Sequence, residues 1–156
     1  MTEVAAATPL IALEALSAAI WVGGLVAIFV AARAASRTLG PRERVAFFRT
    51  LGRSYGVVGT VSLLVALGCG ALLLRGHPWD GLLIAAASVA GALVLATATG
   101  IAQARAMTRL RHRSMAEPSE AIEAQVRRGA ILAGALRGTI ALLTLTLVVL
   151  GAALAA

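Results

Sequence analysis

The stretch EALSAAIWVGG places a carboxylate, Glu14, in a run that is otherwise apolar from residue 9 to residue 32. Helix positions three, four and seven apart share a face, so Ser17 and Trp21 project to the same side as Glu14. A bare carboxylate roughly 7–8 Å inside the apolar boundary would cost a few kcal/mol. We therefore expect Glu14 to be protonated, paired or facing water. This is the chemistry of a protonatable or cation-contacting group in an outward-facing cavity floored by Trp21.

Three further polar side chains are expected at a similar depth in other apolar runs, namely Cys69, Ser88 and Thr146. One interpretation is a polar cluster around Glu14, with Ser17, Trp21 and these three residues as binding candidates. In the alternative interpretation, Glu14 reaches up to the membrane interface and the hydroxyl groups bond to carbonyls of their own helices. The sequence leaves both open.

Arg137 is the other charge within an apolar run, and it lies toward the opposite side of the membrane from Glu14. About half the hydrocarbon thickness would separate the two, which argues against a direct salt bridge. The Arg137 side chain is long enough to extend its guanidinium group to the inner headgroups. It can also contact a phosphate or lipid headgroup together with Arg127 and Arg128.

The residue types that commonly bind haem or metal ions are poorly placed for such a site in this chain. Both histidines, His77 and His112, lie in connections, so facing imidazoles for a haem within the bilayer are not expected. Cys69 is the single cysteine, which excludes an intramolecular disulfide. The sequence has no phosphate-binding loop, nucleophile motif or zinc motif, so it favours a protein without an intrinsic enzymatic site, and it identifies no cofactor.

The elements that must position these residues are membrane spans. Of the 156 residues, 60% are hydrophobic and 13% are charged, and the mean hydropathy is +0.90. A spanning helix needs about 20 mostly apolar residues. Four runs are long enough: 9–32, 54–74, 81–104 and 129–156. We predict an all-α fold, an integral membrane four-helix up-and-down bundle that forms one transmembrane domain over residues 1–156.

Charge indicates the orientation of these spans. All fourteen basic residues are arginine, and twelve of them fall in the two connections at 33–53 and 105–128. By the positive-inside rule both connections are cytoplasmic, which places both termini outside in a multi-pass protein of the cytoplasmic membrane. We interpret the arginine clusters as contacts for anionic lipids rather than for nucleic acid, since few aromatic residues are interleaved.

Breakers set the expected helix ends. Gly40 and Pro41 should stop the first helix near residue 37 and begin the second near residue 41, so the helices extend beyond the lipid. Asp80 is a candidate N-cap for the third helix, and Pro118 is placed to open the fourth. Small residues that allow close helix packing are Gly23, Gly24, Gly100, Gly134 and Gly138. They favour packing within the bundle over a homo-oligomeric face.

The pattern of a polar residue seven before W-V-G-G, in LEALSAAIWVGGLV, resembles the opening helix of the CopD-type copper-resistance membrane domain and its small relatives. The segment FFRTLGRSYGVVGTVSLLVALGCGALLL is similar to their second helix. The resemblance covers residues 11–74 and implies a related membrane fold. Those families commonly carry histidine where this chain has Glu14, so the resemblance does not imply copper binding.

Three functions fit these observations. The leading hypothesis is a small transport-related protein, linked to a proton or small cation, with Glu14 as the intramembrane acidic group. The second is a non-catalytic membrane partner or assembly subunit recognised through the arginine-rich hairpins. The third is a membrane enzyme acting on lipids or quinones.

Overall fold

The computed structural model describes residues 2–116 and 120–155, and these residues form helices and connections without strands. The four helices are α1 (Thr2–Thr38), α2 (Pro41–Leu73), α3 (Gly81–Ala116) and α4 (Glu120–Ala155). All four are long and apolar enough to cross a membrane. The all-α class expected from the sequence is therefore confirmed, and the four helices are consistent with a membrane protein. The side of the membrane that each terminus faces stays a prediction.

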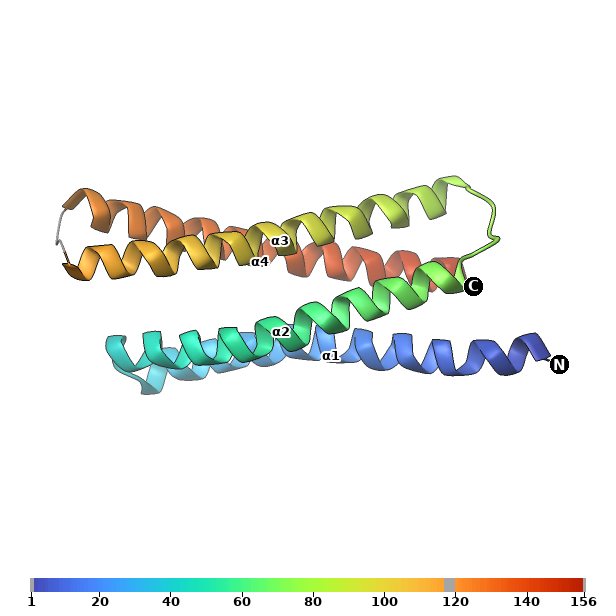
Figure 1. Ribbon diagram of the computed structural model, residues 1–156, viewed down its shortest axis with the longest axis horizontal. Coiled ribbons are helices and arrows are strands. Elements are labelled where there is room, and N and C mark those ends of the chain that lie inside the picture. The colour runs from blue at the N-terminus through green and yellow to red at the C-terminus, as the bar shows by residue number, and fades with distance from the viewer. Residues whose placement is uncertain (1, 117–119, 156) are drawn as a thin grey trace. The chain divides into compact units, whose positions relative to one another are not determined.

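The helices form two compact units, residues Met1–His77 and Pro78–Ala156. In the first unit α1 packs along α2, and in the second α3 packs along α4, each pair as an antiparallel hairpin (Figure 1). Leu63 and Ala35 are buried in the first hairpin, and Leu93 and Leu83 in the second. Each hairpin thus has its own packed seam.

The candidate spans run over Thr8–Thr38, Ala46–Leu73, Gly81–Met107 and Arg128–Ala155. Many of the large apolar side chains in these spans are exposed, among them Phe29, Val57 and Leu95. In water such surfaces would favour association, whereas in a bilayer they contact acyl chains. The exposed apolar surface therefore agrees with a membrane protein.

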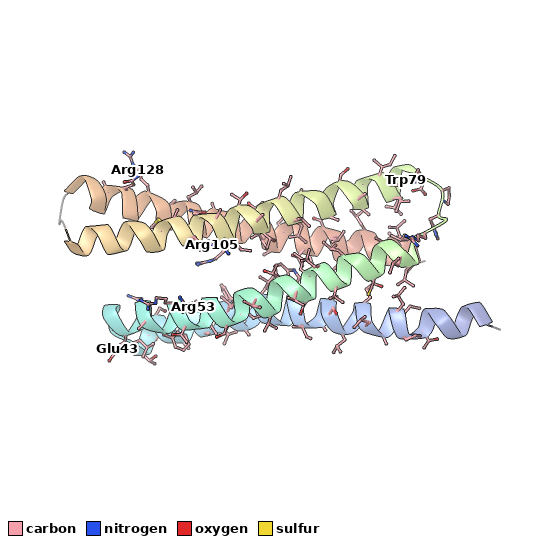
Figure 2. The ribbon with its side chains drawn as sticks, in the orientation of Figure 1. Glu43, Arg53, Trp79, Arg105 and Arg128 are labelled. Carbon is pink, nitrogen blue, oxygen red and sulfur yellow. The ribbon has the colours of Figure 1, made fainter. Side chains whose placement is uncertain are left out.

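The tight connection between α1 and α2 follows from Gly40 and Pro41. Gly40 is extended, with φ −64° and ψ 162°, and Pro41 opens α2, where a missing N–H costs no helical bond. The Glu43 carboxylate accepts a hydrogen bond of 3.1 Å from the Gly40 N–H. The predicted helix end near residue 37 and the predicted start at Pro41 are both confirmed. Figure 2 shows Glu43 at this end of the hairpin.

The connection between α2 and α3 is a turn followed by a helix cap. Gly76 has a φ of +91°, which glycine adopts without the steric cost of a side chain. The Asp80 carboxylate accepts a hydrogen bond of 2.8 Å from the Leu83 N–H, which confirms Asp80 as the N-cap of α3. Trp79 is 76% exposed beside this cap (Figure 2). Pro118, the predicted opener of the fourth helix, lies outside the described residues.

The Asp80 cap gives a first testable expectation. Asp80→Ala should destabilise the α3–α4 hairpin by about 1 kcal/mol, because the Leu83 N–H loses its acceptor. Asp80→Asn is the matched control, since its carbonyl oxygen can accept the same bond. Thermal unfolding followed by circular dichroism in detergent micelles measures both variants. Equal loss of stability in the two would show that the cap bond contributes little.

Candidate functional site

The candidate site is the seam of the α1–α2 hairpin, where α1 contributes Glu14, Ser17 and Trp21. Ser17 and Trp21 are 6% and 7% exposed, and Glu14 is partly buried. The three positions are separated by three and four residues, so they follow one another along a single helix face. All three lie within the candidate span Thr8–Thr38.

Opposite Glu14, α2 presents backbone rather than a side chain. A Cβ added at Gly70 would lie 3.1 Å from Glu14 Oε1, so the carboxylate occupies the space that the glycine leaves open. The neighbouring Cys69 is only 5% exposed and is a free thiol. The first hairpin therefore carries four of the predicted binding candidates, Glu14, Ser17, Trp21 and Cys69, and all four are buried or partly buried.

One side of this seam is fixed by Tyr55 of α2. Its hydroxyl donates a hydrogen bond of 2.8 Å to the Trp21 carbonyl oxygen and is 3.3 Å from the Ile20 carbonyl oxygen. The tyrosine ring lies where a Cβ on Gly24 would be, so it packs directly on the α1 backbone. A hydrogen bond across helices in an apolar environment contributes about 1 kcal/mol. Tyr55 thereby sets the register of α1 against α2.

The Trp21 ring and the Tyr55 ring both lie against Gly59 of α2. A Cβ at Gly59 would lie 3.4 Å from Trp21 Cζ3 and 3.0 Å from Tyr55 Cε1. Gly59 therefore leaves room for both aromatic side chains. Going along α1 from residue 14 to residue 24, the opposing α2 residues are Gly70, Gly59 and Tyr55 in turn. This is the order expected of an antiparallel pair.

The seam combines a carboxylate, a hydroxyl and a thiol inside a candidate membrane span. A carboxylate there can hold and release a proton or contact a cation, and the Ser17 oxygen is a further acceptor. Among the described residues, no group of three or more His, Cys, Asp and Glu side chains could hold a metal ion. The arrangement thus offers proton or small-cation chemistry.

The remaining predicted binding residues, Ser88 and Thr146, belong to the second hairpin. The Ser88 hydroxyl donates to the Ile84 carbonyl at 2.8 Å, and the Thr146 hydroxyl donates to the Leu142 carbonyl at 3.0 Å. Both side chains are exposed. Each hydroxyl therefore satisfies its donor within its own helix.

The inner-face arginine candidates are all on α4. Arg128 and Arg137 are exposed, and the side chain of Arg127 lies outside the described residues. Arg128 is the first residue of the candidate span Arg128–Ala155, and Arg137 lies more than two turns further along it. Exposed arginines at this depth can extend their guanidinium groups toward headgroups.

The predicted packing glycines differ in what surrounds them. Gly24 contacts Tyr55, and a Cβ at Gly100 would lie 3.5 Å from Leu136 Cδ2, so these two lie against the partner helix. At Gly23, Gly134 and Gly138 an added Cβ would meet no described atom within 4 Å. The absence of a side chain makes room for the partner helix at Gly24 and Gly100. Nothing in the described residues explains the glycine at the other three positions.

Sequence reasoning missed Tyr55, Gly59 and Gly70 as parts of this seam. Tyr55 is the only tyrosine of the chain and lies in an apolar run, which was a usable signal, because a buried phenol needs an acceptor. The two glycines are among sixteen, and nothing in the residue type distinguishes them from the others.

No protein-family model matches the chain, and comparison with curated proteins and with solved structures finds no match.

Proposed function

We propose that this protein is a transport-related protein of the cytoplasmic membrane in which Glu14 carries a proton or contacts a small cation. The observation that supports the proposal most directly is the position of the Glu14 carboxylate, which fills the space over Gly70 within two candidate spans. Carboxylates in spans are costly, and they commonly mark ion or proton pathways.

The surroundings of Glu14 suit reversible protonation better than permanent pairing with a cation. The arginine nearest to Gly70 in sequence is Arg75, which lies in the turn after α2 and is exposed. The Ser17 hydroxyl and the Cys69 thiol of the same hairpin are buried. A carboxyl group in such surroundings can exchange a proton without breaking a salt bridge.

The proposal includes an orientation. With both arginine-rich connections in the cytoplasm, the termini and the connection containing Trp79 face outward, and Glu14 lies in the outer part of α1. The likeness of the first two helices to the CopD-type membrane domain is part of the same proposal. This likeness supports the importance of the Glu14–Trp21 face, and it does not support copper binding.

The deciding experiment compares Glu14→Gln with the unmodified protein in liposomes that contain a pH-sensitive dye. After an imposed pH or monovalent-cation gradient, the unmodified protein should dissipate the gradient faster than empty liposomes. Glu14→Gln keeps the side-chain shape but cannot ionise, so its flux should fall to the rate of liposomes without protein.

Glu43→Gln is the matched control, because it removes a carboxylate from the same hairpin outside the seam. Glu43 is exposed, and glutamine can still accept the bond from the Gly40 N–H. Its flux should equal that of the unmodified protein. Equal flux in Glu14→Gln and the unmodified protein would eliminate the proposed role of Glu14.

A further inference from the structure

A groove of about 360 Å³ lies between α3 and α4. From α3 it is lined by Gln103, Ala106 and Met107, and from α4 by Gln125, Arg128, Gly129 and Leu132. All of these residues belong to the second hairpin, so the groove is separate from the Glu14 seam. It combines a cation and two carboxamides with apolar side chains.

Gly129 shapes this groove. The Met107 thioether lies where a Cβ on Gly129 would be, so the glycine lets the Met107 side chain cross onto α4. Beside it, Gln103 Nε2 donates a hydrogen bond of 3.1 Å to the Gly129 carbonyl oxygen. This bond holds the Gln103 side chain across the two helices. The Gln103 carboxamide has two N–H bonds and lines the groove at the point where one of them is bound to Gly129.

The groove lies at the ends of two candidate spans. Met107 is the last residue of the span on α3, and Arg128 is the first residue of the span on α4. Leu132 lies one turn inside the membrane from Arg128, and Gln125 lies about one turn outside it. Leu132 is therefore level with acyl chains, whereas Arg128 and Gln125 are level with headgroups, and Gln103 lies one turn inside the Met107 end of the span on α3.

The polar lining is suited to a phosphate group. A guanidinium donates paired hydrogen bonds to phosphate oxygens, and carboxamide N–H groups add single donors. Among the side chains that the structure describes, no acidic one lines the groove. The volume is at the lower end of the range for small-ligand sites, enough for a headgroup but not for a whole lipid.

We propose that this groove binds the phosphate of an anionic phospholipid of the surrounding bilayer, with Arg128 and Gln103 as donors and Met107 and Leu132 against the glycerol and first acyl carbons. A soluble phosphate shares the donor chemistry but would leave the apolar lining unused. The lipid fits both halves of the groove. It would hold α3 and α4 together at the arginine-rich end.

The test is native mass spectrometry of the detergent-solubilised full chain, titrated separately with phosphatidylglycerol, phosphatidylcholine and inorganic phosphate. Phosphatidylglycerol should bind more tightly than phosphatidylcholine, and inorganic phosphate should not compete with it at millimolar concentration. Competition by inorganic phosphate at the affinity of the lipid would overturn the lipid assignment.

Arg128→Gln should weaken phosphatidylglycerol binding about fivefold or more, which is the contribution expected of one arginine near an anionic headgroup. Arg128→Lys keeps the charge but not the fork of donors, so its loss should be smaller. Arg105→Gln is the matched control. Arg105 is an exposed arginine of the same hairpin that does not line the groove, and it points away from Arg128 in Figure 2.

The control should bind phosphatidylglycerol within about twofold of the unmodified protein, because surface arginines away from the groove add only a screened attraction. Equal weakening by Arg105→Gln and Arg128→Gln would overturn the proposal, since it would show general surface electrostatics rather than a site. Because the readout is lipid binding, it is independent of flux through the Glu14 seam.

Discussion

Gly24→Ala is expected to destabilise the α1–α2 hairpin by roughly 1–3 kcal/mol, the usual range for inserting a methyl group into a packed interface. The Tyr55 ring already occupies the position of the new Cβ, so the ring must move or the helices must separate. Either change weakens the hydrogen bond from the Tyr55 hydroxyl to the Trp21 carbonyl. Methyl insertion and loss of this bond therefore act in the same direction.

The single cysteine provides the measurement. Cys69 is buried in this hairpin, so its rate of alkylation across a denaturant series reports opening of the hairpin. Gly23→Ala is the adjacent control, because an added Cβ there meets no described atom within 4 Å. Alanine in a helix should leave its stability unchanged or raise it by up to about 1 kcal/mol. Similar alkylation profiles for the two variants would contradict the close contact of Tyr55 with α1.

Glu14 and Gly70 should be energetically coupled. Gly70→Val places a branched side chain in the space of the Glu14 carboxylate, which must then turn out of the seam toward lipid. Exposing a carboxyl group to lipid is unfavourable, so the single variant should lose roughly 1–3 kcal/mol of stability. In the Glu14→Ala background the obstruction is gone, and the same valine should cost much less. The coupling energy should be about 1 kcal/mol or more.

Circular dichroism of unfolding in mixed micelles gives the four stabilities of this double-mutant cycle. A parallel cycle with Gly68→Val serves as the control, since an added Cβ at Gly68 meets no described atom within 4 Å. That cycle should be additive within about 0.5 kcal/mol. Additivity in the Gly70 cycle as well would mean that the carboxylate does not occupy the seam.

Local chemistry made the helices and their ends predictable. Apolar runs longer than the bilayer is thick define spans without reference to tertiary contacts. Gly40 with Pro41, and Asp80 before Gly81, act on the backbone of their immediate neighbours, so the end of α1 and the starts of α2 and α3 could be read from the sequence. The continuation of α1 back to Thr2, through Pro9, was not anticipated from the sequence. A helix can continue past a proline because the proline removes only one helical hydrogen bond.

The partners across each seam were not predictable in the same way. The facing of Glu14 and Gly70 depends on the rotation and register of two helices, which apolar composition leaves open. Nearly every position around the helices is apolar, so the usual contrast between a buried and a solvated face is missing. Ser17 and Trp21 could be placed beside Glu14 because they share its helix. Gly70 could not, since it lies on another helix and has no side chain.

The packing of α1 on α2 is made within the first 77 residues, and the two helices are joined by a connection of minimal length at Gly40. Closing such a short connection costs little chain entropy. During synthesis α1 and α2 are both present before α3 is complete, and compact units of a growing chain generally fold as they emerge. The Glu14 seam would then be assembled as a preformed pair of helices, and its geometry would already be set when the second hairpin enters the membrane.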